Sequence, residues 1–151
     1  MNVNRWVPAP RSAVFAAFLD AEALVAWLPP AGMTGEIHRF DARVGGGYAM
    51  TLRYERPGPE VRGKTTADAD SVAVRFVEIV PNARLVQAID FATDDPSYGG
   101  TMTMTWTFAD VSGGTEVAVE VVDAPPGISE ADHEIGIRSS LDNLDCYLRY
   151  P

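Results

Sequence analysis

Few residues of this chain are suited to acid–base chemistry, and Glu78 is the most informative of them. In residues 72–80 the even positions are mostly valine or phenylalanine, and Glu78 shares their spacing. Alternate residues of a strand point to opposite faces, so an inward-facing even set brings Glu78 into the interior. A partly desolvated carboxyl group has a raised pKa and can act as a general acid or orient a ligand. Two alternatives remain open: Glu78 reaches water or pairs with an arginine near the strand end, or Arg75 of the odd set points inward.

The two histidines are the other candidates for proton transfer. His133 falls one turn into the last predicted helix, where packing against Ile128 and capping compete with a catalytic role. His38 lies in a strand whose facing the pattern does not assign. The two are far apart in sequence and lack the short spacing of paired ligands, so no metal site is predicted.

Three further motifs are better explained without chemistry. Asp94 and Asp95 lack the alternating ligands and closing glutamate of a calcium loop, which favours a solvated turn. The glycines at 45–47 lead into a strand rather than a helix, so they indicate a bulge or tight turn instead of a phosphate loop. Cys146 is predicted to be a half-buried packing residue of the last helix. No serine has the setting of a nucleophile elbow, and we predict no catalytic residue and no cofactor.

Composition narrows the class of partner. The chain has 151 residues, 46% of them hydrophobic, and 12 basic against 21 acidic residues give a net charge of −9. This charge repels phosphate backbones and anionic lipid, which disfavours nucleic-acid and membrane roles. One cysteine, no signal-peptide pattern and no apolar run approaching about 18 residues predict a cytoplasmic protein.

The helices and strands that must position these residues are predicted from the periodicity of apolar residues and from the positions of proline and helix-capping residues. We expect one domain over residues 1–151, with a strand before Pro8, a helix after Pro10 and a second short helix capped by Asp20. Alternation then predicts strands near 35–40, 47–54, 72–80, 84–91, 101–108 and 115–122, with residues 55–71 mostly a loop that holds a short edge strand near 61–65. Ser129, followed by Asp132, predicts the start of a last helix of about 20 residues.

Residues 101–108, TMTMTWTF, separate a threonine face from a face of methionine and aromatic residues. Threonine suits a wet sheet face, so Met102, Met104 and Trp106 should face something apolar. The long apolar partner that the sequence offers is the stripe Ile137, Leu141, Leu144 and Leu148 of the last helix.

This order of elements resembles the helix-grip fold of the START-related (SRPBCC) superfamily, and more closely the bacterial single-domain relatives of the activator of the 90-kDa heat-shock-protein ATPase. The residues that carry the likeness are Ala9-Pro10, Trp27-Leu28-Pro29-Pro30, Gly32-Met33, FDARVGG at 40–46, GGTEVAVEV at 113–121 and PPGISEADHEIG at 125–136. The resemblance implies an α+β fold in which a curved antiparallel sheet of six to seven strands, in the order β-α-α-β6-α, wraps around a long C-terminal helix.

The resemblance also implies a cavity between sheet and helix that holds a small hydrophobic or aromatic molecule, such as a lipid or a polyketide. In many relatives a tryptophan follows the glycine of the last helix, whereas Ile137 follows Gly136 here, which leaves more room. Methionine adapts to varied apolar shapes, which suits such a lining. We expect the ligand to contact Trp27, Met33, Tyr48, Met50, Phe76, Glu78, Phe91, Met102, Met104, Trp106, Ile137 and Leu141.

Two other roles remain alternatives. One is a cyclase- or hydrolase-like enzyme that uses a pocket residue as acid or base. The other is a chaperone ATPase-activating module, which is less expected because the eukaryotic co-chaperone has an additional domain for which this chain has no room. Exposed strand edges also allow a homodimer.

Overall fold

The computed structural model describes residues 1–59, 61 and 63–150. Seven strands, three α-helices and one 3-10 turn follow in the order β1 (Asn2–Val7), α1 (Arg11–Phe18), α2 (Ala21–Trp27), β2 (Met33–Asp41), β3 (Gly47–Tyr54), β4 (Ala69–Val80), β5 (Arg84–Phe91), η1 (Pro96–Tyr98), β6 (Met102–Val111), β7 (Gly114–Val122) and α3 (Glu130–Arg149). The α+β helix-grip class predicted from the sequence is confirmed.

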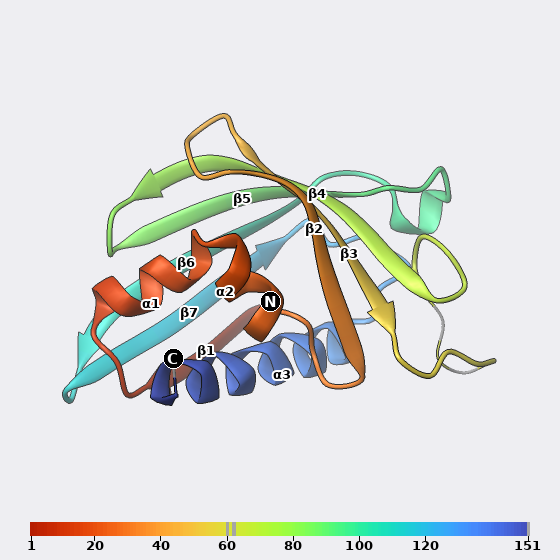
Figure 1. Ribbon diagram of the computed structural model, residues 1–151. Coiled ribbons are helices and arrows are strands. Elements are labelled where there is room, and N and C mark those ends of the chain that lie inside the picture. The colour runs from red at the N-terminus through yellow and green to blue at the C-terminus, as the bar shows by residue number, and fades with distance from the viewer. Residues whose placement is uncertain (60, 62, 151) are drawn as a thin grey trace.

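All seven strands form one antiparallel sheet in the order β1-β7-β6-β5-β4-β3-β2. Every neighbouring pair is antiparallel. The first strand of the chain, β1, forms one edge of the sheet, and the second, β2, forms the other. The sheet is strongly curved, and α1, α2 and α3 all lie on its concave side, with α3 running along the open side of the curve (Figure 1). The helices therefore cover one face of the sheet and leave the other to solvent.

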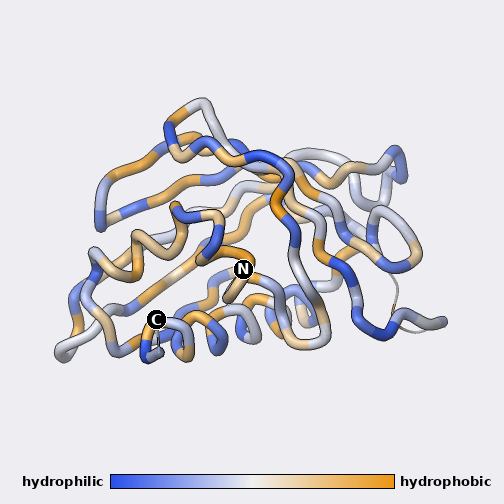
Figure 2. Tube along the Cα trace, viewed as in Figure 1, coloured by the Kyte–Doolittle hydropathy of each residue, from blue (hydrophilic) through white to orange (hydrophobic). Residues whose placement is uncertain are grey.

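Local signals account for the helix ends. Asp20 Oδ1 accepts hydrogen bonds from the backbone N–H groups of Glu22 and Ala23, which caps α2. Ser129 Oγ accepts from the N–H of Asp132 at 3.1 Å and caps α3, as the spacing predicted. Helix α3 has 20 residues and alternates hydrophobic with hydrophilic positions along its length (Figure 2). Its apolar stripe is buried at Ile137, Leu141 and Leu144.

The apolar side of β6 has two partners rather than the one expected. Phe108 packs edge-on against Phe15 and Phe18 of α1, with ring centroids 5.6 and 5.2 Å apart. Trp106 also meets Phe18, at 4.9 Å. Helix α1 therefore covers the far end of β6, and only the stretch from Met102 to Trp106 is left to face α3. The helix after Pro10 was predicted, but its eight residues carry only a short apolar stripe, which did not identify it as a partner of β6.

A β-bulge in β4 changes which of its residues point inward. Phe76 lies opposite Gln87 of β5, but Glu78 lies opposite Val86, so Val77 is an extra residue. Val74 and Phe76 are buried, as the even set predicted. Beyond the bulge the odd residue Ile79 packs on the core instead. The alternation read from the sequence is correct for the first half of β4 and wrong for the second.

Three smaller predictions concern the loops and α3. The edge strand expected near 61–65 includes Arg62, which lies outside the described residues. Cys146, expected to be half-buried, is exposed. Within the described residues, no helix combines the length and the apolarity that a membrane span requires.

Candidate ligand-binding cavity

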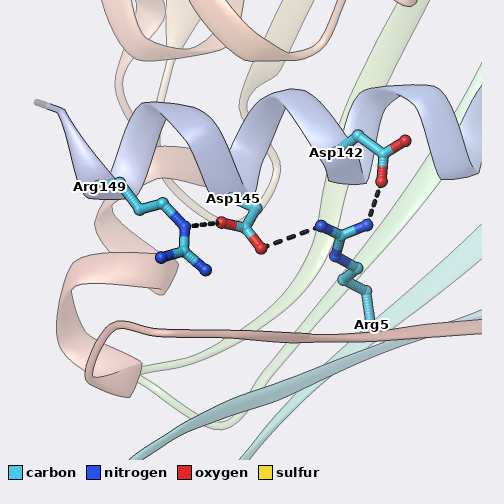
Figure 3. Close-up of polar contacts among 4 residues, drawn as sticks. All are labelled: Arg5, Asp142, Asp145 and Arg149. Carbon is cyan, nitrogen blue, oxygen red and sulfur yellow. Dashed lines mark hydrogen bonds and ion pairs between the residues drawn. The ribbon is translucent and has the colours of Figure 1, made fainter.

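Helix α3 is fixed mainly through its second half. Ser140 Oγ donates to the carbonyl oxygen of Leu28 at 2.6 Å, and Asn143 Nδ2 donates to that of Pro29 at 2.9 Å. On the other side, Arg5 of β1 bridges Asp142 and Asp145 (Figure 3). These bonds hold the helix against α2 and β1, away from the middle of the sheet.

A cavity of about 760 Å³ lies between the first half of α3 and the centre of the sheet. His133, Gly136, Ile137 and Ser140 line it at helical spacing from α3. The inner faces of β3, β4, β5 and β6 form the other wall, and loop residues such as Tyr98 and Ile128 border it. The volume is within the 300–1,000 Å³ typical of small-molecule sites.

A second hollow, of about 480 Å³, lies on the solvent-facing side of the sheet. Thr105, Thr107 and Arg84 line it. It lacks the convergent aromatic and thioether side chains of the cavity beneath α3, so we take the larger cavity as the candidate site.

Eight of the twelve ligand contacts expected from the sequence line this cavity. They are Met33, Tyr48, Met50, Phe91, Met102, Met104, Trp106 and Ile137. Most are almost completely buried and face an apolar space, so this part of the lining suits a hydrophobic guest.

Three of the remaining four are core residues outside the lining. Trp27 is fully buried, donates from Nε1 to the carbonyl oxygen of Ala17 and packs on Phe18. Phe76 is covered by Tyr48. Leu141 is buried one turn after Ile137 and is not part of the lining. The sequence pattern predicted that these side chains point inward. It does not show whether an inward side chain packs against other residues or faces a cavity.

Glu78 also lies outside the lining. The bulge at Val77 places it on the outer face, where it pairs with Arg84 at 3.0 Å. Its side chain is 45% exposed. The expectation of a desolvated carboxyl group is therefore corrected in favour of the alternative, a solvated ion pair near the strand end. Arg75, the other candidate of this strand, is exposed.

A polar cluster that was not predicted from the sequence lies at the floor of the cavity. Gln87 is buried on the inner face of β5 between Leu85 and Ile89, and its Oε1 accepts a hydrogen bond from Trp106 Nε1 at 3.1 Å. The signal was present: a glutamine interrupts the apolar face of 84–91. Burial raises the pKa of the neighbouring Tyr48, and the Gln87 amide opposes this shift only in part.

Ionisable groups lie at the rim. Lys64 Nζ pairs with the buried Asp70 at 2.9 Å, and both residues line the cavity. Burial lowers the pKa of His133, and the positive charge of Lys64 lowers it further. Burial raises the pKa of Tyr54. His133 is thus a neutral imidazole at neutral pH, with access to the cavity.

The other residues considered for chemistry take structural roles. His38 is exposed, and its Nε2 lies 2.8 Å from Thr51 Oγ1, away from the cavity lining. Asp95 caps η1 by accepting from the N–H of Ser97. Among the described residues, no three histidine, cysteine, aspartate or glutamate side chains are grouped to hold a metal ion.

Fold and cavity together define a helix-grip protein of the START-like class. Residues 8–149 match the family model described as Activator of Hsp90 ATPase homolog 1-like protein. The chain belongs to this family, as the sequence resemblance indicated. None of the curated proteins compared with the chain matches it.

Solved structures share the whole architecture. A protein from Chromobacterium violaceum is 29% identical, with a TM-score of 0.86, and the match covers 100% of this chain and 97% of that one. A protein from Arthrobacter aurescens has a TM-score of 0.81 at 17% identity and covers 99% and 86%. A protein of the dynemicin biosynthetic locus has a TM-score of 0.68 at 19% identity; the match covers 99% of this chain but 47% of that one. At identities of 17% and 19%, the second and third of these structures show a shared fold and no more.

Proposed function

We propose that this protein binds a small hydrophobic or aromatic molecule in the cavity between the sheet and α3. The observation that carries the proposal is a space of about 760 Å³ with a wall of methionine and aromatic side chains. An apolar guest that fits this cavity buries its own apolar surface and that of the cavity wall, and this burial favours binding.

The side chains of the lining allow the cavity to accept ligands of different shapes. Met50, Met102 and Met104 are flexible and polarizable, so they can follow different ring systems. A polyketide-like aromatic molecule is one class of guest that such a lining can hold. A lipid chain fits the same lining, so the test uses both classes.

Gly136 provides a way to close the cavity without disturbing the core. A Cβ atom placed there has no heavy atom within 4 Å, and the residue lines the cavity. We expect Gly136→Phe to fold and to fill part of the space. Native mass spectrometry and thermal shift against fatty acids and aromatic metabolites should then show binding to the wild type and to Gly136→Ala, and at least about tenfold weaker binding to Gly136→Phe. Equal binding by all three proteins would place the ligand elsewhere and refute the proposal.

A cyclase- or hydrolase-like activity is the second candidate, and His133 is the observation that favours it. A neutral imidazole at the cavity rim can accept a proton from a bound substrate. The test is a screen of aromatic ketones and esters for turnover by the wild type. His133→Asn should abolish the turnover while leaving ligand affinity within a few-fold; unchanged turnover in that variant would exclude this role for His133.

A chaperone-activating role is a further alternative, because the matching family model is described as Activator of Hsp90 ATPase homolog 1-like protein. That role requires docking to a chaperone and stimulation of its ATPase rate. A pull-down against the chaperone, with the ATPase rate measured at increasing concentrations of this protein, tests it; no retention and an unchanged rate would exclude it.

A further inference from the structure

The floor of the cavity holds two polar side chains among apolar ones. Gln87 and Tyr48 are both more than nine-tenths buried, and both line the cavity. They project from β5 and β3, on either side of β4. Burying an amide and a phenol in an apolar region is unfavourable unless their hydrogen-bonding groups find partners.

The orientation of the Gln87 amide follows from its neighbour. The indole N–H of Trp106 is a donor only, so the atom that faces it at 3.1 Å is the amide oxygen. The two N–H groups of Nε2 therefore point away from Trp106. The amide lies close enough to the Tyr48 hydroxyl to favour its ionised form, although burial dominates and raises its pKa. Tyr48 thus remains a neutral phenol with a proton to donate.

These donors open onto the cavity. Among the described residues, no fully enclosed side-chain nitrogen or oxygen lacks a hydrogen-bond partner. Apart from the contact between the Gln87 amide and the Tyr48 hydroxyl, no protein hydrogen bond engages the Tyr48 hydroxyl proton or Gln87 Nε2 among the described residues. Both groups are therefore available to a guest at the floor.

We propose that Gln87 and Tyr48 form a two-donor site for one carbonyl oxygen of the ligand, so that the guest is an apolar or aromatic ketone, quinone or ester that enters carbonyl first. This inference rests on the proposed function and specifies its ligand. Two neutral donors match a neutral acceptor. A carboxylate would bring a full charge to a floor without a cation, because Lys64, the cationic side chain of the described lining, is already paired with Asp70 at the rim.

A pair of probes that differ only at the carbonyl group tests the site. Fluorenone and fluorene have the same tricyclic outline, and equilibrium dialysis gives the dissociation constant of each. The informative quantity is the ratio of the two constants in each protein, because hydrophobic burial of the rings and any general weakening of the cavity affect both probes alike. The variants are Gln87→Met and Tyr48→Phe, each close in volume to the original residue. Ile89→Val is the control, since it lines the same cavity without a polar atom.

We expect the preference for fluorenone to fall by about fivefold or more in Gln87→Met and in Tyr48→Phe, and to stay unchanged in Ile89→Val, because one hydrogen bond to the carbonyl is lost in each polar variant. Thermal melts establish that each variant is folded, and either polar variant alone suffices for the comparison. A ratio unchanged in both, with fluorene and fluorenone still binding, would overturn the carbonyl site and leave the proposed function intact. Failure of both probes and of the wider panel to bind the wild type would overturn both.

Discussion

Arg5 on β1 and Asp145 on α3, 140 residues apart in the sequence, are joined by a hydrogen bond of 2.9 Å from Nη2 to Oδ2 (Figure 3). Asp145 also accepts from Arg149 one turn further along α3. Burial raises the pKa of Asp145, but the hydrogen bonds from Arg149 and Arg5 outweigh it and hold the pKa below its ordinary value. The pair therefore keeps a nearly buried carboxylate charged and attaches the helix to the edge of the sheet.

We expect Arg5→Met to lower the free energy of unfolding by about 1–2 kcal/mol, because Asp145 keeps only one charged partner in a site with 11% side-chain exposure. Urea denaturation at pH 7 measures the change. Arg138→Gln is the matched control: its ion pair with Glu134 is a half-exposed i,i+4 contact, so its removal should change stability by less than about 0.5 kcal/mol. Equal effects of the two substitutions would contradict this account of Asp145.

The same site predicts how stability responds to acid. Because the folded protein holds the pKa of Asp145 below its unfolded value, the unfolded state binds more protons as the pH falls. The contribution of Asp145 is present above about pH 4 and is lost as the pH falls through the folded pKa. Urea midpoints from pH 6 to pH 3 should show the gap between wild type and Arg5→Met narrowing below about pH 4; a constant gap would argue against the assignment.

Two glycines with equally open surroundings should respond in opposite directions to alanine. A Cβ atom meets nothing within 4 Å at either Gly136 or Gly113. Gly136 lies inside α3, where Gly136→Ala should stabilise the protein by about 0.5–1 kcal/mol. Gly113 has a φ of +78° in the turn between β6 and β7, so Gly113→Ala should destabilise it by about 1 kcal/mol. Thermal melts distinguish the two, and changes of the same sign would contradict the backbone argument.

Local signals in the sequence were sufficient for most of the fold. The alternation in 47–54 and 84–91 predicted β3 and β5 at their observed bounds. Capping residues Asp20 and Ser129 placed the starts of α2 and α3. These features depend on neighbours a few residues away, which is why they can be read before the chain folds.

Features that depend on pairing between distant segments could not be read in this way. The bulge at Val77 arises where β4 pairs with β5 and turns Glu78 to the opposite face of the sheet. Nothing in the residues of β4 alone indicates it. Likewise, the stripe of α3 predicted that Ile137 and Leu141 both point inward, but not that Ile137 faces the cavity while Leu141, one turn later, is packed in the core. The Lys64–Asp70 pair joins a loop to β4 and has no periodic signal at all.

The revised position of Glu78 leads to a direct test. Glu78→Gln should change the free energy of unfolding by less than about 0.5 kcal/mol, since the carboxylate is exposed and its pair with Arg84 is solvated. Dissociation constants for cavity ligands should stay the same, because the side chain lies outside the lining. Gln87→Met, which changes a lining residue, serves as the contrast. A marked loss of ligand affinity in Glu78→Gln would restore the inward orientation expected from the sequence.

His133 should make stability depend on pH near neutrality. Its pKa in the folded protein is lowered, first by burial and then by the charges of Lys64 and the N-terminal amino group, so the unfolded state binds more protons between that pKa and the ordinary value of about 6.5. Stability therefore rises with pH across this window and falls as the medium becomes more acidic. Urea midpoints at pH 5, 6 and 7 should change less in His133→Gln than in the wild type. His38→Gln, which alters an exposed histidine outside the cavity, should follow the wild-type slope. An NMR titration of His133 with a midpoint at or above its ordinary value of about 6.5 would remove the basis for this dependence.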